Sequence, residues 1–286
     1  MDIGRIGLWT FAFDYQPISE VRRVVAEIEE LGYGAVWIPE LAGREALTHA
    51  SILLASTERM VIANGIARIG DRSPRATAAG QRTLADAYPD RHLLGLGVGR
   101  PKPNGAKPLD AMRAYLDEMD HVEIPSPEPK HKPVRVLAAY GPAMMQLAAE
   151  RASGAHTYKV TVEHTAWARK ILGPDSLLAV EQAIMIERDP EVARRVARAH
   201  LGYYLKTPQN LAKFRRLGYG EKDLADGGSD RLIDALVAWG GIDRIVARIR
   251  AQLEAGADHV GVQVIGVEPG DATMSRWRLL AEALFG

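Results

Sequence analysis

Short apolar runs alternate with segments of helical periodicity along almost the whole chain. Between the first two runs, apolar residues from Val21 to Leu31 recur at the spacing of one helix face, with Ser19 as the predicted N-cap and Gly32 just past the end. The eight runs that we interpret as strands lie at 6–8, 35–38, 60–63, 92–96, 134–138, 154–157, 177–186 and 258–265.

Each predicted strand is followed by a helical pattern rather than by a hairpin turn. Ser73-Pro74 and Pro142 each begin a helix, because proline is tolerated at the first helical position. Crossovers of this length favour a parallel sheet, and eight units favour a closed (β/α)8 TIM barrel of the α/β class. We therefore expect one barrel domain over 1–286, with a helical excursion over 187–241 packed beside it. That excursion carries helical patterns near 190–205, 208–216 and 229–239.

Composition and charge exclude several classes of protein. Thirty-six basic and thirty-six acidic residues give a formal net charge of +0, so no global field attracts nucleic acid or anionic lipid. The absence of cysteine removes disulfides, thiolate metal sites and a cysteine nucleophile. The first residues lack the features of a signal peptide, and no run approaches about 18 apolar residues. We expect a soluble, cytoplasmic protein without a nucleic-acid or membrane partner.

The carboxyl ends of barrel strands are where chemistry is expected. Glu40 follows the second strand, and His156 lies at the end of the sixth. A histidine at such a position either exchanges a proton with substrate or is a hydrogen-bonded structural residue. Arg68, Asp71 and Arg72 follow the third strand, and form either a site or an ion-paired loop.

Two glycine-containing turns are candidates for ligand contact. Gly95, Gly97 and Gly99 end the fourth strand, but Arg100-Pro101 follows, so no helix opens there as a dinucleotide fingerprint requires. Such glycines permit close approach of backbone to a ligand, or only tight packing inside the barrel. Tyr140-Gly141-Pro142 joins the fifth strand to a helix, so free N–H groups there predict a phosphate or carboxylate site. No regular metal-ligand spacing or hydrolase motif occurs, and we expect no metal.

Three stretches of the sequence resemble the bacterial-luciferase-like flavin and deazaflavin oxidoreductases. These are GYGAVWIPE at 32–40, VIANGIARIGDRSPRATAAGQRTLADAYPDRHLLGLGVG at 61–99 and AAYGPAMMQLAAERASGAHTYKVTVEHTAWARKILGP at 138–174. The chain is more narrowly similar to the actinobacterial branch that depends on coenzyme F420, a deazaflavin. The resemblance implies a barrel with an insertion, an isoalloxazine-type ring across the barrel mouth, and a homodimer, which is common among similar proteins.

The resemblance also implies the residues that hold the coenzyme. A bulge after the third strand, often with a non-proline cis peptide, backs the ring in relatives, and would fall at Asn64, Gly65 and Ile66. Gly97, Gly99 and Arg100, after the fourth strand, are also predicted to contact the coenzyme. The phosphate would lie against the turn and segment formed by Tyr140, Gly141, Pro142, Tyr158, Lys159 and Val160, which includes the anion site inferred from the residues alone.

The chain departs from the relatives that oxidise a sugar phosphate. Leu41 stands where those relatives have a histidine, and Arg100 stands where they have a glutamate. We therefore do not expect sugar-phosphate dehydrogenation. Arg100, Lys102 and Lys107 make this loop basic, which suits the acidic tail of the deazaflavin or an ordinary solvated loop.

These inferences favour an F420-dependent oxidoreductase that moves a hydride to or from a small organic substrate. Glu40 or His156 would handle a proton, while Trp9, Phe11, Trp37 and Arg44 would line the substrate pocket unless the aromatic residues serve only as core. Two alternatives stay open: an FMN-dependent luciferase-like monooxygenase, and a cofactor-binding protein without turnover.

Overall fold

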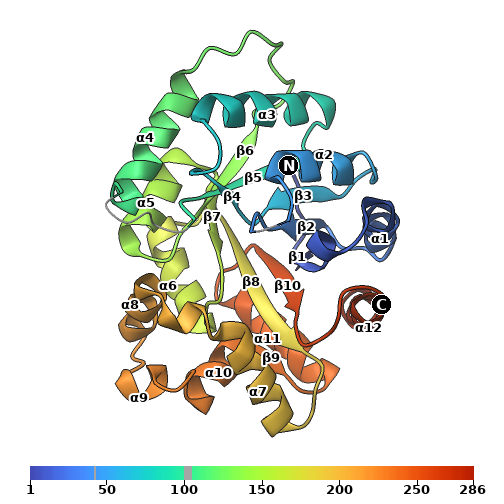
Figure 1. Cartoon of the computed structure of the whole chain (residues 1–286), viewed down its shortest axis with the longest axis vertical. Helices are drawn as coiled ribbons and strands as arrows, with labels where there is room; N and C mark the ends of the chain where they lie inside the picture. The colour runs from blue at the N-terminus through green and yellow to red at the C-terminus, as the bar shows by residue number, and fades with distance from the viewer. Residues whose placement is uncertain (42, 100–104) are drawn as a thin grey trace.

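The computed structural model describes residues 1–41, 43–99 and 105–286, and its centre is a closed parallel barrel (Figure 1). Hydrogen bonding follows the order β10-β1-β2-β3-β5-β6-β7-β8, and β8 closes the ring by pairing with β10 from Ala179 to Ile184. All these pairings are parallel, and the predicted TIM barrel is confirmed. The barrel strands are β1 (Ile6–Trp9), β2 (Ala35–Ile38), β3 (Val61–Asn64), β5 (His92–Gly97), β6 (Val134–Ala138), β7 (Gly154–Thr157), β8 (Leu177–Met185) and β10 (His259–Val264).

Eight helices follow these strands and bury one face each against the barrel. In the first, Val21, Val24, Val25 and Ile28 are buried, as the periodicity predicts, although Pro17 rather than Ser19 is the N-cap. Ser73 caps the third helix by accepting a hydrogen bond from the backbone N–H of Ala76. The helices are α1 (Ile18–Glu30), α2 (Ala46–Leu54), α3 (Pro74–Ala87), α4 (Pro108–His121), α5 (Pro142–Arg151), α6 (Val162–Leu172), α11 (Ile242–Glu254) and α12 (Asp271–Phe285).

Between β8 and α11 the chain forms short elements that share a hydrophobic cluster of their own with the end of β8. Figure 1 shows α7 to α10 gathered at one end of the molecule, at the bottom of the view. The elements are α7 (Pro190–Leu201), the 3-10 helix η2 (Tyr204–Lys206), α8 (Pro208–Arg216), α9 (Glu221–Leu224), α10 (Asp230–Leu236) and β9 (Val237–Trp239).

One element in this region differs from its prediction. The helix expected over 229–239 ends at Leu236, and Val237, Ala238 and Trp239 form β9, which pairs with Ala183–Met185 of β8. Pairing with a strand about fifty residues earlier overrides the local helical pattern, since β-branched and aromatic residues suit a sheet edge. Two other short elements were not predicted: η1 (Ala12–Tyr15) after β1, and β4 (Ala67–Arg68), which pairs with β5.

The apolar cluster inside the barrel is separate from the apolar layer between the strands and the helices. Trp9, Trp37, Ala63, Val136 and Ala179 belong to it, and all are nearly inaccessible to solvent. Because successive strand residues point to opposite faces, the next inward side chain on each strand lies two residues further towards its carboxyl end. This alternation determines which side chains reach the barrel mouth.

Candidate active site

Two tryptophans and two histidines form a layer inside the barrel beneath the mouth. The indole N–H of Trp9 donates to Nε2 of His156 at 3.3 Å, and the indole N–H of Trp37 donates to Nε2 of His259 at 2.9 Å. In both histidines Nδ1 faces a backbone carbonyl, that of Ala179 at 3.2 Å and that of Gly4 at 2.7 Å. Since Nε2 accepts, Nδ1 carries the proton and both rings are neutral.

His156 therefore has both ring nitrogens engaged. Its ring also stacks on Trp37 at a centroid distance of 4.2 Å, and burial lowers the pKa of His156 to about 3. His156 and Trp37 thus form a neutral, rigid floor under the mouth. This geometry does not favour the predicted proton transfer by His156, and it places Trp37 below the surface that a substrate would touch.

Inward positions at the ends of β3, β5 and β6 carry almost no side chain. A Cβ on Gly65 would lie 2.5 Å from Nε1 of Trp9, so the backbone there packs directly on the inner layer. A Cβ on Gly95 would lie 1.9 Å from the backbone oxygen of Asn64. A Cβ on Gly97 would meet Cδ1 of Ile66 at 2.5 Å. With Ala138 on β6, these positions form a low wall, which we call the bare wall, and the Gly65–Ile66 peptide bond in it is cis.

Asn64 supports the bare wall from its outer side. Its amide donates to the backbone oxygen of Ala46 at 3.1 Å, and its Oδ1 lies 3.0 Å from Nε2 of His92. Gly99 has a φ of 71°, with Cδ of Arg68 2.8 Å from the site of an added Cβ. The predicted coenzyme contact Arg100 lies outside the described residues, as does Lys102.

Glu40 holds the loop that follows β3. Its carboxylate forms an ion pair with Arg72 and also accepts hydrogen bonds from the backbone N–H groups of Ala46 at 3.2 Å and Arg68 at 2.7 Å. Both oxygens are engaged, and the side chains of Glu40 and Arg72 are each only 8% exposed. Arg68 pairs with Asp71 at 2.5 Å, which confirms the ion-paired loop. The contacts of Glu40 favour a structural role over the predicted proton transfer.

Arg44 has a similar supporting position near the β1 loop. Its guanidinium donates to the backbone oxygens of Phe13 at 2.9 Å and Gln16 at 2.5 Å. It therefore fixes η1 and the turn after it. The side chain of Phe11, by contrast, is half-buried, and its ring packs edge-on against Trp9 at 4.7 Å.

The turn from β6 into α5 leaves a helix N-terminus open. Gly141 is the N-cap without a side-chain cap, Pro142 is at the first position, and a Cβ on Gly141 would have nothing within 4 Å. The backbone oxygen of Tyr140 accepts from Arg216 at 3.2 Å. Nζ of Lys213 lies 4.6 Å from the centre of the Tyr140 ring. Two basic side chains thus contact Tyr140, two residues before the first turn of a helix whose free N–H groups suit an anion.

A buried polar cluster lies between the end of β7, β8 and the helices α7 and α8. Glu181 on β8 accepts from the backbone N–H of Lys159 at 2.8 Å, and the ammonium of Lys159 donates to Nε2 of His200. Lys213 of α8 donates to the backbone oxygens of Lys159 at 2.7 Å and Tyr158 at 3.3 Å. Lys159, Glu181 and Lys213 are at most 2% exposed.

Burial sets the protonation tendencies of this cluster. It lowers the pKa of Lys213 to about 7, with the charge of Lys159 acting in the same direction. It also lowers the pKa of Lys159 and raises that of Glu181, and each of these two charges opposes the shift of the other. Lys159 was predicted from the sequence as a coenzyme contact, whereas Glu181 and Lys213 were not predicted. The available signal was a glutamate in the middle of the otherwise mostly apolar strand LLAVEQAIM.

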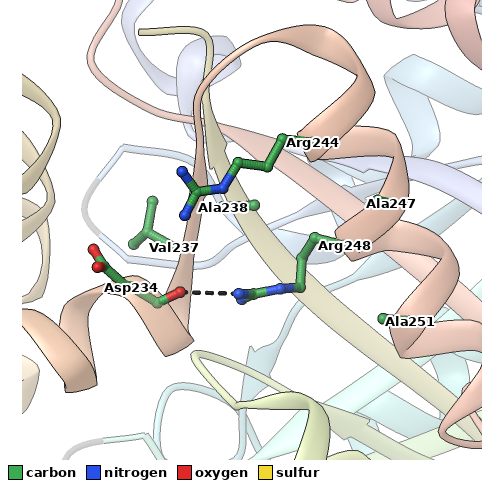
Figure 2. Close-up of a pocket in the computed structure, with 7 residues that line it drawn as sticks. All are labelled: Asp234, Val237, Ala238, Arg244, Ala247, Arg248 and Ala251. Carbon is green, nitrogen blue, oxygen red and sulfur yellow. Dashed lines mark hydrogen bonds between the residues drawn. The ribbon is translucent and has the colours of Figure 1, made fainter. Parts of the chain in front are cut away.

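A shallow pocket lies outside the barrel, between α10, β9 and α11. Figure 2 shows Arg244 and Arg248 reaching from α11 across Val237 towards Asp234. The guanidinium of Arg248 donates to the backbone oxygen of Asp234 at 2.9 Å, the bond that is dashed in the figure, and that of Arg244 stacks on Trp239. These contacts join α10 to α11, so the barrel mouth remains the stronger candidate. Among the described residues no group of three histidine, aspartate or glutamate side chains is arranged to hold a metal ion.

The family model of luciferase-like monooxygenases matches residues 5–122. The resemblance to luciferase-like proteins is confirmed. This luciferase-like segment contains β1, β2, β3 and β5 and thus two strands of the bare wall. Over 120 residues the chain is 30% identical to a Mycobacterium tuberculosis protein named as a coenzyme F420-dependent oxidoreductase. The match covers 40% of this chain and 35% of that relative's length.

Several solved structures share the whole fold. An F420-dependent secondary alcohol dehydrogenase in complex with an F420–acetone adduct matches with a TM-score of 0.74 at 14% identity, covering 98% of each chain. Coenzyme F420-dependent tetrahydromethanopterin reductase from Methanopyrus kandleri matches with a TM-score of 0.74 at 16% identity, covering 99% of this chain and 98% of that one. The oxygenating constituent of 3,6-diketocamphane monooxygenase from Pseudomonas putida, with FMN, gives 0.70 at 16% identity, covering 97% and 96%. At these identities the likeness shows the fold. Among the described helices, none is both long and apolar enough to cross a membrane.

Proposed function

We propose that the chain is a coenzyme F420-dependent oxidoreductase that transfers a hydride between the deazaflavin and a small organic substrate at the barrel mouth. The observation that carries the proposal is the bare wall, in which Gly65, Gly97 and Ala138, on or directly after three adjacent strands, present almost no side chain to the barrel mouth. The names of the Mycobacterium tuberculosis relative and of two solved neighbours, which include F420, support the same coenzyme.

The residues of the bare wall fit a planar ring. The backbone at Gly65 and Ile66 packs on Trp9 without an intervening side chain, so it presents peptide atoms to the mouth. Ile66 is half-buried and leans on Gly97, where any larger residue would displace it. Gly65, Ile66 and Gly97 would hold one face of the ring, leaving the other face towards Phe11 and the rest of the mouth.

The open N-terminus of α5 suits the coenzyme's phosphate. Gly141 and the first turn after Pro142 would provide N–H donors, and Lys213 and Arg216 would add positive charge. The segment Tyr158–Val160 is a weaker partner than the sequence suggests. Its Lys159 N–H already donates to Glu181, and the oxygens of Tyr158 and Lys159 already accept from Lys213.

When bound, the deazaflavin supplies the carbon that accepts or releases a hydride. The chain itself would orient the coenzyme and the substrate and exclude water from between them. Holding the reacting atoms in contact in this way lowers the reaction barrier substantially. Phe11 and Tyr158 form an aromatic side of the mouth, and both pack on the buried Trp9 beneath it, at ring-centre distances of 4.7 Å and 4.8 Å. A small apolar substrate portion would pack against these rings.

Equilibrium titration of the purified chain with F420 and with FMN, followed by fluorescence, tests the proposal. We expect saturable F420 binding, weaker FMN binding, and coenzyme turnover with some member of a panel of carbonyl, alcohol and imine substrates. Tight FMN binding without F420 binding would instead favour the FMN-dependent monooxygenase, which the FMN-containing neighbour makes the second candidate. F420 binding without turnover on the panel would indicate a cofactor-binding protein.

A further inference from the structure

Glu181 is distinguished from the other carboxylates by its place in the barrel. Of the residues in the ten described strands, it is the only one with a carboxylate side chain. It pairs in register with Gly261, whose site for a Cβ lies 3.2 Å from Trp37, and it alternates with Ala179 of the interior cluster. Glu181 therefore points inward, one step above the layer of Trp37 and His156.

One oxygen of Glu181 is hydrogen-bonded, and the other is buried without a hydrogen-bond partner among the described residues. Oε2 accepts the backbone N–H of Lys159 at 2.8 Å, and Lys159 adopts a φ of 52° at this point. Oε1 is buried and has no hydrogen-bond partner within 1–41, 43–99 and 105–286. A buried polar atom without a partner is costly unless a ligand or water meets it. Glu181 is thus fixed in position by one oxygen, while the hydrogen-bonding capacity of Oε1 is unused.

The two candidates for proton transfer that the sequence indicated lack this property. Both oxygens of Glu40 are engaged by Arg72 and backbone N–H groups, and both nitrogens of His156 are engaged inside the barrel. The charged and titratable groups around Glu181 are Lys159, Lys213, Tyr140 and Tyr158. Burial favours the protonated carboxyl and the two ammonium groups oppose it, so Glu181 is suited to exchange a proton.

We propose that Glu181 is the residue that exchanges the reaction's proton with the substrate. In the oxidative direction, the C–H bond of an alcohol breaks and its electron pair leaves as hydride to the deazaflavin, while the O–H proton passes to Oε1 of Glu181 and a carbonyl forms. In the reductive direction, the protonated carboxyl returns that proton to the oxygen as the hydride arrives at carbon. This assignment rests on the proposed function, and it adds the chemical class of substrate: a carbonyl compound and its alcohol.

The Glu181→Gln variant tests the assignment, because its amide oxygen still accepts the N–H of Lys159 while the exchangeable acid is lost. Turnover with a panel of ketones and secondary alcohols is expected to fall by about 10²- to 10⁴-fold. The dissociation constant for F420 is expected to stay unchanged. Infrared difference spectra of wild type and E181Q without coenzyme should show the carbonyl stretch of one protonated carboxyl, lost in the variant. Glu254→Gln, at an exposed residue ending α11, is the matched control and should behave as wild type.

The outcomes separate the two claims. Turnover by E181Q equal to wild type, or no infrared band that depends on Glu181 at any pH at which the chain stays folded, would overturn the role of Glu181. A wild-type chain that neither binds F420 nor turns it over would overturn the proposed function instead. If E181Q does not fold, Glu181→Asp carries the test: retracting the carboxyl by one methylene should lower turnover while keeping the band, and full turnover would refute the proposal.

Discussion

Alanine substitutions at three glycines should separate the packing of the bare wall from its proposed contact with the coenzyme. In Gly95→Ala the new Cβ would lie 1.9 Å from the backbone oxygen of Asn64, whereas real Cβ atoms essentially never approach within 3.0 Å. A shift of more than 1 Å is needed, and both atoms belong to strands of the barrel. We expect an overpacking cost of about 3 kcal/mol, which lowers the melting temperature of a chain of this length by about 5 °C.

Gly97→Ala makes a softer clash. Its Cβ would meet Cδ1 of Ile66 at 2.5 Å and Cγ1 at 2.7 Å, the end of a side chain that can rotate. The cost to folding should be about 1 kcal/mol, because an off-rotamer side chain costs roughly that much. The displaced Ile66 would intrude on the ring site, so F420 affinity should fall about tenfold, equivalent to about 1.4 kcal/mol.

Gly141→Ala makes no clash, since nothing lies within 4 Å of its Cβ. Stability should change by less than about 1 kcal/mol, while F420 affinity falls because the methyl group occupies the space of the phosphate. Gly220→Ala is the matched control: Gly220 is also a helix N-cap with open space around its Cβ, but it caps α9 rather than α5. Thermal unfolding and F420 titration measure both quantities. Unchanged stability of G95A would refute the packing argument, and unchanged F420 affinity of G97A would refute the position of the ring.

Three further predictions concern the groups around the mouth. Glu40→Ala should reduce stability by about 3 kcal/mol, because it leaves Arg72 without its buried partner; lost turnover at an unchanged melting temperature would instead restore Glu40 as a proton-transfer group. Lys213→Met should speed amide exchange in α8, since it removes the donors to the oxygens of Tyr158 and Lys159, and exchange equal to wild type would contradict that anchoring role. Burial lowers the pKa of His156 to about 3 from an ordinary value near 6.5, so the unfolded chain binds a proton first as the pH falls. The stability that a neutral His156 contributes is therefore complete above about pH 6.5 and is lost towards pH 3, by about 1.4 kcal/mol at pH 5.5; denaturant titrations that show the same pH slope in His156→Gln would contradict this.

The sequence was sufficient to predict the barrel because its signals are local. Apolar runs separated by capped amphipathic helices fix the order of elements, and Ser73-Pro74 marks a helix start that the structure reproduces. The strand β9 was missed because it depends on pairing with β8, about fifty residues away in the chain. The pattern of residues over 229–239 carries no information about pairing with β8.

The positions of the site residues were easier to predict than their hydrogen-bond and ion-pair partners. Glu40 and His156 lie near the strand ends where chemistry is expected, but their partners, Arg72 and Trp9, are 32 and 147 residues away. Glu181 was missed because strands buried on both faces show no alternation, so the sequence does not reveal which face points inward. Which side chains of β8 point inward is determined only when β8 pairs with β10 and closes the barrel.

A crystal structure of the chain with bound F420 is the decisive test of the proposed coenzyme site. We expect the deazaflavin ring to lie against Gly65, Ile66 and Gly97, with the phosphate at the N-terminus of α5. A ring bound outside the barrel mouth, or a mouth that takes up FMN and excludes F420, would contradict it.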